Sequence, residues 1–406
     1  MVLIQSPRDA APNTVSAEVE ALIEEARRRR RRRWAGRLLI GAVVLGVAAV
    51  VAVWRASGTH SPIGGGGTSS GPLPDGSVAT LHTAGPLAVA RDGALYVTDG
   101  VGEGVEPGGD RVLVRLPNGR FRVVAGSGRI GFSGDGGLAV RAELSSVTDL
   151  AFAANGTLYV ADGGRVRTVS RNGVIRTIAG DGRPSQRIAN GTPALAAPLG
   201  SGLPALNIAL SPSGHLFIAT GSQILRLTAA GRLEVVRAVI TSGRDRGLRL
   251  GGGPIAVDAQ GNIDVAGGPS GWGIWQVAPN GIAHLTSAAM YAHGNGGAPP
   301  ILERTPGDAV YAAAGSLGIF RVEPDKLVAS AAYNELLSRP LHDEPFTPYY
   351  IAVGPNGWLY TDDQTGGYTL KPQYASLARQ QLLSIANDRI TVLWHGINRA
   401  EIAPAH

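Results

Sequence analysis

The chain contains no cysteine, which excludes disulfide bonds, thiolate metal sites and cysteine nucleophiles. Lysine is nearly absent as well, since only Lys326 and Lys371 occur beside 35 arginines, and this bias indicates a high-GC bacterial genome. Aromatic residues make up 5% of the 406 residues, whereas glycine (58) and proline (26) are abundant. A composition of this kind favours many short strands joined by tight turns over a helical bundle.

Charge is not concentrated in the larger part of the chain. The net charge is +6, but residues 1–55 carry ten arginines against five acidic residues, which leaves 27 basic and 26 acidic side chains for residues 56–406. A protein that binds duplex nucleic acid needs several cations on one face, and no arginine run of that kind occurs after residue 55. We therefore expect no nucleic-acid partner.

Patterns typical of catalytic and metal sites are also missing. The eight histidines are scattered, and no two have the i,i+2 or i,i+4 spacing of metal ligands. No G-x-S-x-G nucleophile motif stands out. The sequence GFSGDGGLA at Gly131–Ala139 lacks the Gly-Lys-Ser/Thr end of a phosphate-binding loop, so it predicts a tight turn between repeats. We predict no catalytic residue, no metal ligand and no cofactor.

One long apolar run lies near the N-terminus. Seven arginines, Arg27–Arg33, precede Trp34 and the run LLIGAVVLGVAAVVAV, which is followed by Trp54 and Arg55. From Trp34 to Trp54 a helix would be about 31 Å long, which matches a hydrocarbon core of about 30 Å. By the positive-inside rule the arginines keep the N-terminus in the cytoplasm. We therefore predict a single-pass protein of the cell membrane whose remaining chain lies outside the cytoplasm.

Three alternatives to this anchor stay open: a cleaved signal peptide, a twin-arginine export signal and a soluble basic arm. A cleavable signal normally has a shorter apolar stretch and a small-residue cleavage site directly after it, and Ala56-Ser57-Gly58 beside Trp54 and Arg55 fits that pattern poorly. The anchor is the favoured interpretation.

The chain divides into four predicted parts. Residues 1–33 form a basic cytoplasmic segment and residues 34–55 a transmembrane helix. Residues 56–76 are rich in Gly, Ser and Pro, a composition typical of flexible linkers. Residues 77–406 form a repeat domain.

The repeat domain contains six copies of one strand-turn-strand pattern. The clearest copies are GPLAVARDGALYVTDG from Gly85 and TDLAFAANGTLYVADG from Thr148, and a third and a fourth strand pattern follow each of them. Four antiparallel strands per unit make one blade, so the sequence predicts an all-β, six-bladed β-propeller. The glycines of the first turn recur at intervals of 46 to 63 residues, at Gly93, Gly156, Gly214, Gly261, Gly307 and Gly357.

The first strand of each copy alternates with period two. Its middle position is a small residue in five copies, as expected where inner strands crowd around an axis, and the next position is apolar except in the fifth copy, which has Glu303. The first apolar positions are Leu87, Leu150, Ile208, Ile255, Ile301 and Ile351.

These motifs resemble NHL repeats. The resemblance is carried by YVAD from Tyr159, by the VRTV, NG and IRTIAGDG run that ends at Gly182, and by GFSGDGGLA at Gly131–Ala139. It is specific over residues 85–195 and only architectural from 196 to 395. The resemblance implies a platform that binds proteins or ligands, as in the extracytoplasmic sensor domains of some bacterial receptor kinases. This chain departs from those receptors, because only 33 residues precede the predicted span.

The resemblance also leaves an enzyme open as the alternative. Some six-bladed propellers with related blades are calcium-dependent lactonases, strictosidine-synthase-like enzymes or metal-dependent lyases, whose ligands come from the starts of inner strands. Here those positions hold one carboxylate, one amide and one phenol, whereas a hard cation prefers six or more oxygen ligands. A protein- or ligand-binding and sensing platform is therefore the favoured function, with an envelope protein or a small ligand as partner.

The candidate site follows from the same positions. Asp149, Asn207 and Tyr350 each stand just before the first apolar residue of their copy, so they should lie at the same height around the axis. We predict that a small ligand or a cation binds beside them at one mouth of the central channel. The alternative is that each side chain caps its own strand or lines a water-filled channel.

Two further expectations concern the ends of the ring. Residues 77–82 could add an extra strand to the last blade, although Arg389–Trp394 already supplies a fourth strand there. Residues 327–339 and 374–383 are helix-prone and could form insertions that cap one face.

Overall fold

The computed structural model describes residues 78–100, 109–200, 206–243, 245–268, 273–287, 300–305, 309–313, 319–323, 326–329, 350–363, 381–386 and 389–395. They all belong to one compact unit of the chain, Ser70–His406. The predicted anchor and linker, residues 34–55 and 56–76, lie outside the described residues. Within the described residues, no helix is long and apolar enough to cross a membrane.

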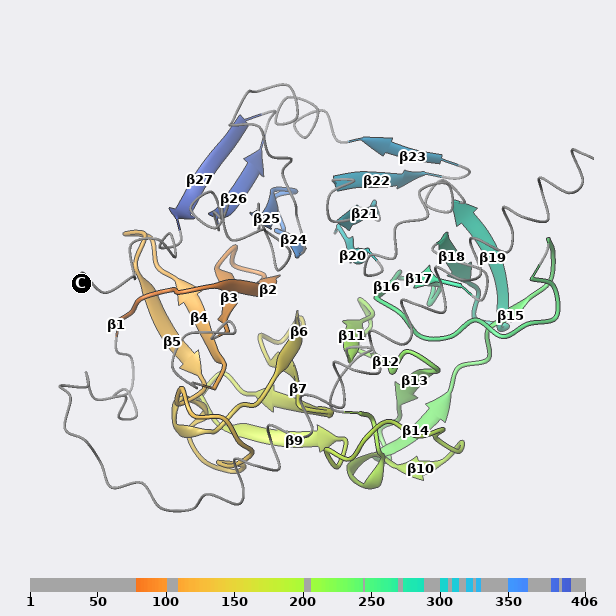
Figure 1. Ribbon diagram of the computed structural model, residues 1–406, viewed down its shortest axis with the longest axis horizontal. Helices are drawn as coiled ribbons and strands as arrows, with labels where there is room; N and C mark the ends of the chain where they lie inside the picture. Colours follow the sequence, from red (N-terminus) through yellow and green to blue (C-terminus); the bar gives the residue numbers. More distant parts are fainter. Residues whose placement is uncertain are drawn as a thin grey trace, which may run out of the picture. The chain divides into compact units, whose positions relative to one another are not determined.

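The strands form six sheets, which are the six blades (Figure 1). Blade 1 contains β1 (Val78–Ala79), β2 (Ala84–Val89), β3 (Leu95–Asp99), β4 (Arg111–Arg115) and β5 (Phe121–Ala125). Blade 2 contains β6 (Val147–Phe152), β7 (Leu158–Asp162), β8 (Arg165–Val169) and β9 (Ile175–Ala179). Blade 3 contains β10 (Thr192–Pro193), β11 (Asn207–Leu210), β12 (Leu216–Ala219), β13 (Ile224–Leu227) and β14 (Arg232–Val235).

The other three blades repeat this order. Blade 4 contains β15 (Val239–Ile240), β16 (Ile255–Val257), β17 (Ile263–Gly267), β18 (Gly273–Val277) and β19 (Ile282–Ser287). Blade 5 contains β20 (Ile301–Arg304), β21 (Val310–Ala313), β22 (Ile319–Glu323) and β23 (Lys326–Ala329). Blade 6 contains β24 (Ile351–Val353), β25 (Leu359–Asp363), β26 (Gln381–Ala386) and β27 (Arg389–His395). Two short 3₁₀ helices, η1 (Ala139–Arg141) and η2 (Ala194–Ala196), lie between blades 1 and 2 and between blades 2 and 3.

The inner strands close a ring. β2, β6, β11, β16, β20 and β24 each contact the next inner strand, and β24 contacts β2. Figure 1 shows them around the centre, with the later strands of each blade progressively farther out. The predicted six-bladed, all-β propeller is confirmed.

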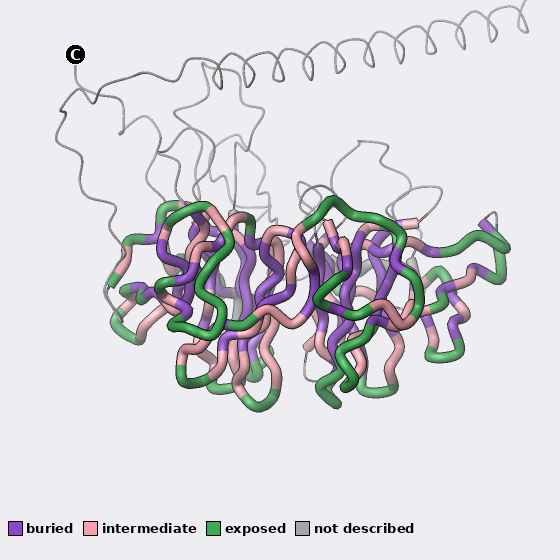
Figure 2. Tube along the Cα trace, turned by 90° about the horizontal axis from the view of Figure 1, so that it is seen from below, coloured by how far each residue is buried: buried purple, intermediate pink, exposed green. Residues whose placement is uncertain are grey.

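The hydrophobic core is divided among the contacts between blades. Each of its six clusters joins two neighbouring blades, and the cluster that contains Leu87 and Val97 of blade 1 also contains Ala352 and Leu382 of blade 6. Figure 2 shows the buried residues as the interior of a disc with exposed turns on both faces. Closure of the ring therefore depends on apolar burial between blades.

The turn predictions also hold where the structure describes the residues. The first turns contain glycine with positive φ at Gly93, Gly156, Gly214, Gly261 and Gly357, a conformation that costs glycine little. Gly307 lies outside the described residues.

Two predictions about the ends of the ring are wrong where the structure tests them. The extra strand, β1, pairs with β5 of the first blade instead of joining the last blade, where β27 is the fourth strand as predicted. The helix-prone stretches include strand residues, since β23 begins at Lys326 and β26 at Gln381. At the described residues of these stretches, 327–329 and 381–383, strand pairing overrides helix propensity.

Candidate functional site

Asp149 lies at the inner edge of blade 2, in β6. Its Oδ1 accepts a hydrogen bond from the N–H of Leu150 at 2.8 Å, and its Oδ2 accepts one from the N–H of Ile208 at 2.8 Å. The second bond crosses to β11 of blade 3, and Thr148 adds a parallel link by donating from Oγ1 to the carbonyl of Leu206 at 2.6 Å. Asp149 therefore links the inner strands β6 and β11 by a hydrogen bond.

The other two predicted site residues have different surroundings. Asn207 is buried beside Ile208, the residue that donates to Asp149. Tyr350 is half-buried and packs against the hydrophobic cluster shared by blades 6 and 1, while its N–H donates to Asp362 Oδ1 at 2.6 Å. The structure thus brings the neighbourhoods of Asp149 and Asn207 together and places Tyr350 two blades away from Asp149.

Glu303 is a second acidic group of the inner strands, and the sequence-based site omitted it. It lies in β20 of blade 5 and accepts a hydrogen bond from the N–H of Val353 in blade 6. β6 and β20 are opposite members of the ring, and the negative charge of Asp149 raises the pKa of Glu303. The signal for Glu303 was present in the sequence, as a charged residue at a position that is apolar in the other five copies.

Both carboxyl groups hold their protons unusually strongly. Desolvation by the surrounding protein raises the pKa of Asp149 to about 7, against the smaller opposing effect of its two backbone hydrogen bonds. Desolvation, together with the negative charge of Asp149, raises the pKa of Glu303 to about 8. In the part of the chain that the structure describes, no cationic side chain lowers the pKa of either carboxyl group.

Other buried acidic groups have a structural role that repeats from blade to blade. Asp99, at the end of β3, accepts hydrogen bonds from the N–H groups of His82 and Thr83, at 2.8 and 3.0 Å. Asp162, at the end of β7, accepts them from Ser145 and Ser146 in the same way, at 2.8 and 3.1 Å. These carboxylates fix the chain that enters the inner strands of blades 1 and 2, whereas Asp149 and Glu303 link neighbouring inner strands.

A comparison with known families locates the most recognisable part of this fold. The family model described as "Teneurin NHL domain" matches residues 125–198, which contain all of blade 2. The fold is an NHL-repeat β-propeller.

Curated relatives match over a similarly short stretch. Teneurin-1 of Homo sapiens is 36% identical over 106 residues, which is 23% of this chain and 4% of that protein. Teneurin-1 of Mus musculus is 35% identical over 106 residues, with the same coverage. Because the match spans so little of the teneurins' length, only the NHL character of this segment follows from it.

Solved propellers resemble the chain over more of its length but more loosely. A virginiamycin B lyase from Staphylococcus aureus has a TM-score of 0.40 at 12% identity, covering 78% of this chain and 87% of its own. A gluconolactonase from Xanthomonas campestris has a TM-score of 0.43 at 14% identity, covering 72% and 88%. At these scores the likenesses carry no argument about this chain.

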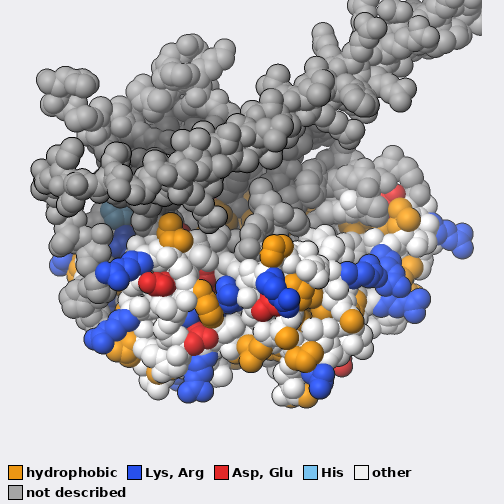
Figure 3. All heavy atoms as spheres, turned by 60° about the horizontal axis from the view of Figure 1, so that its bottom comes forward, with side chains coloured by type: hydrophobic (Ala, Val, Ile, Leu, Met, Phe, Trp, Pro, Cys, Tyr) orange, Lys and Arg blue, Asp and Glu red, His pale blue; other side chains and the backbone are white. Residues whose placement is uncertain are grey.

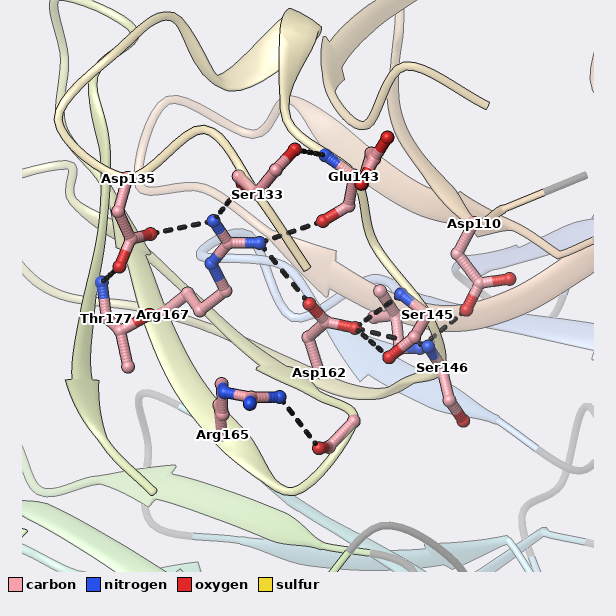
Figure 4. Close-up of polar contacts among 12 residues, drawn as sticks. Asp110, Ser133, Asp135, Glu143, Ser145, Ser146, Asp162, Arg165, Arg167 and Thr177 are labelled. Atoms are coloured by element: carbon pink, nitrogen blue, oxygen red, sulfur yellow. Dashed lines mark hydrogen bonds and ion pairs between the residues drawn. The ribbon is translucent and has the colours of Figure 1, made fainter. Parts of the chain in front are cut away.

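Within the matched segment, a buried arginine organises the NHL blade (Figure 4). Arg167 of β8 has no exposed surface, and its guanidinium donates to the carbonyls of Ser133 and Glu143 at 2.7 and 3.0 Å. It also pairs with Asp135 at 2.7 Å and with Asp162 at 3.5 Å. The buried guanidinium of Arg167 therefore holds the glycine-rich loop against the blade through its contacts with Ser133 and Asp135.

The glycine-rich loop also covers the outer edge of blade 2. The second carboxylate oxygen of Asp135 accepts the N–H of Thr177 in β9 at 3.0 Å, and the N–H of Gly136 donates to the carbonyl of Ile175 at 2.8 Å. Asn190 occupies the same position in blade 3, where its Oδ1 accepts the N–H of Val235 at 2.9 Å. The sequence GFSGDGGLA is thus an inter-blade turn that protects a sheet edge, as predicted.

Chemically, the ring of inner strands carries two acidic groups on opposite members, β6 and β20. No group of three or more His, Asp or Glu side chains suited to a metal ion occurs among the described residues. Asp149 and Glu303 can exchange protons near neutral pH or balance a positive charge in the channel. Those are the properties of a site for a cationic group.

Proposed function

We propose that this NHL-repeat β-propeller is a binding and sensing platform, held outside the cytoplasm by a single-pass anchor, that takes a cationic group at one mouth of its channel. The observation that carries the proposal is the pair Asp149 and Glu303 on opposite inner strands: burial raises the pKa of both, the charge of Asp149 raises that of Glu303 further, and no cationic side chain of the described residues offsets them. A positively charged ligand would remove the cost of ionising both groups.

The chemistry of the pair favours an amine-bearing ligand over a resident metal ion. Each carboxylate already accepts a backbone hydrogen bond, and a hard divalent cation wants six or more oxygen ligands. An ammonium group needs only two or three acceptors, which two opposed carboxyl groups and nearby backbone carbonyls can supply.

The membrane anchor is supported by the sequence alone. The seven arginines before the apolar run and the tryptophans at its two ends fit a span with a cytoplasmic N-terminus. Protease added to spheroplasts should then degrade the repeat domain while residues 1–33 stay protected. Protection of the whole chain in intact spheroplasts would contradict the orientation.

The ligand site is tested by thermal stability. A binder raises the unfolding midpoint by mass action, so the full chain is titrated with calcium, magnesium, a diamine and a panel of neutral and anionic metabolites. We expect the amine to raise the midpoint of the wild type but not of Asp149→Ala or Glu303→Ala. Asp92→Asn, a change in an exposed turn of blade 1, should keep the response of the wild type.

Two results would redirect the proposal. An amine response that survives in both alanine variants would move the site away from the channel. Consumption of a lactone or another metabolite in the panel would support the enzyme alternative in place of the platform.

A further inference from the structure

Side-chain contacts link two inter-blade loops at blade 2. The Arg165 guanidinium lies 3.8 Å from the ring centre of Phe132 and donates to the carbonyl of Asp181 at 2.8 Å. Arg183 pairs with Asp181 at 2.5 Å and donates to the carbonyl of Ala196, the residue after Leu195, at 3.4 Å. These contacts therefore hold the loop that carries Phe132 close to the loop that carries Arg183 and Leu195.

Both loops expose large apolar side chains. Ile130 is 59% exposed, Phe132 44% and Leu195 61%. Exposed arginines stand beside them in the same two loops, at positions 129, 183 and 187. We call the six residues Arg129, Ile130, Phe132, Arg183, Arg187 and Leu195 the blade 2 rim.

Among the exposed side chains of residues 125–198, basic residues outnumber acidic ones. Between residues 125 and 198 six arginines are exposed, whereas Asp135 is the one exposed acidic residue of that range, and it already pairs with Arg167. Two half-buried acidic residues also lie in these loops, Glu143 beside Gly131 and Asp181 paired with Arg183. Figure 3, which brings the edge formed by β9, β10 and β14 forward, shows basic and hydrophobic side chains interspersed, with several acidic side chains among them. This excess of exposed arginines is local, because residues 56–406 as a whole are nearly neutral.

The strand through which the chain enters the domain lies next to the strand that leads into one of the two loops. β1, the first described strand, lies on the outer edge of blade 1 and pairs with β5, the strand that leads into the loop of Arg129 and Phe132. The linker predicted at residues 56–76 has 21 residues and a composition for which the r.m.s. end-to-end distance is about 25 Å. The anchor of the proposed function would thus hold this arc of the ring within reach of the lipid.

We propose that the blade 2 rim docks on anionic lipid headgroups, with Arg129 and Arg187 on the phosphates and Ile130, Phe132 and Leu195 inserted between them, so that the propeller stands edge-on to the membrane. Apolar side chains flanked by arginine are what an interfacial membrane contact requires. A soluble polyanion would use the arginines but would leave the three apolar side chains in water. The proposal rests on the anchor only for the proximity of the membrane.

The absence of cysteine makes the test direct. Ile130→Cys and Leu195→Cys are labelled with an environment-sensitive fluorophore in the full chain, which is reconstituted into vesicles of phosphatidylcholine with or without phosphatidylglycerol. Trp358→Cys is the matched control, because Trp358 is an exposed apolar residue of blade 6, with 41% exposure. We expect a blue shift of the labels at 130 and 195 only with phosphatidylglycerol, reversed by high salt, and no change at 358.

Arginine variants measure the electrostatic part. One cation near an anionic surface contributes about 1 kcal/mol, so Arg129→Gln and Arg187→Gln should each lower the ratio of docked to undocked label about fivefold. Arg91→Gln, in an exposed turn between β2 and β3, should leave the ratio unchanged.

The remaining outcomes separate the docking proposal from the membrane anchor, because each of them contradicts only one of the two. Emission at 130 and 195 that is the same in both lipid mixtures overturns the docking. A blue shift produced by soluble polyglutamate and not by vesicles also overturns it and identifies an acidic protein as the partner. Release of the unlabelled chain by alkaline carbonate contradicts the anchor, and the labels on added vesicles then still report on docking.

Discussion

The Oδ2 atom of Asp149 accepts the N–H of Ile208 at 2.8 Å, so a carboxylate of the inner strand β6 links blade 2 to blade 3. The ligand-binding role proposed for Asp149 and its structural role are therefore coupled. Asp149→Asn keeps an oxygen that can accept one of the two backbone hydrogen bonds and removes the charge, whereas Asp149→Ala removes both. Comparing the two variants separates the charge from the fastening.

The first prediction concerns pH. The pKa values of Asp149 and Glu303 are raised in the folded chain to about 7 and 8, from ordinary values of 3.8 and 4.5. The folded state therefore binds protons that the unfolded state has released, and the stability that this provides is full below about pH 4 and is lost as pH rises through 7 to 8. We expect the unfolding midpoint to fall between pH 5 and pH 8.5, as followed by circular dichroism.

Glu303→Gln is the control for that trend. The neutral amide can still accept the N–H of Val353 and has no proton to lose. At pH 8.5 this variant should be more stable than the wild type by at least about 1.4 kcal/mol, the equivalent of one pKa unit, and at pH 5 the two should be similar. Equal pH profiles for the two proteins would show that Glu303 titrates normally.

The second prediction concerns the buried cation of blade 2. Arg167→Met fills much of the same volume but leaves Asp162 buried without its cationic partner and frees the carbonyls of Ser133 and Glu143. Removing one partner of a buried ion pair costs about 3–5 kcal/mol. Arg171→Met, on an exposed arginine of the same blade, should change the free energy of unfolding by less than about 0.5 kcal/mol. Urea denaturation of both variants measures the difference.

Features that depend on residues close together in the sequence could be predicted, and features that depend on distant residues could not. The six blades follow from short patterns, such as alternation around Leu150 and the glycine turn at Gly156, which act within one hairpin. The role of Asp149 as a link to blade 3 was not predictable, because the N–H that it binds is 59 residues away. Glu303 was visible only as an exception to the repeat, since its significance depends on a residue on the opposite side of the ring. The pairing of β1 with blade 1 was missed because two residues carry no register information.

The third prediction compares two glycines of the GFSGDGGLA loop. Gly134 and Gly136 both have positive φ, at 87° and 83°, so alanine is strained at either position. A Cβ atom on Gly134 would also lie 2.8 Å from the Cα of Ala142, whereas a Cβ on Gly136 would meet nothing within 4 Å. We expect Gly136→Ala to cost about 1 kcal/mol and Gly134→Ala about 1–3 kcal/mol more, by thermal unfolding. Equal costs would mean that Ala142 can move away.

The last prediction concerns the loop that carries Arg183, Arg187 and Leu195. The side chain of Gln223, buried in the β12–β13 turn, accepts the N–H of Ile188 at 2.6 Å and donates to its carbonyl at 3.0 Å. The amide of Gln223 thus pairs with both backbone groups of Ile188, as a neighbouring strand would. The two hydrogen bonds connect the loop to blade 3. Gln223→Leu would leave both backbone groups of Ile188 buried and unsatisfied.

An unsatisfied buried polar group costs about 1–3 kcal/mol, so Gln223→Leu should destabilise the loop by about 2–6 kcal/mol. Gln186→Leu, an exposed glutamine of the same loop, should be nearly neutral. The measurement is hydrogen exchange: the amide of Ile188 should lose protection in Gln223→Leu while the amides of β7 and β8 keep theirs. Loss of protection throughout blades 2 and 3 would instead show that the loop and the blades unfold as one unit. If the loop alone is released, the lipid-dependent shift of the label at Leu195 should weaken as well, because the loop that carries Leu195 would no longer be connected to blade 3 through Gln223.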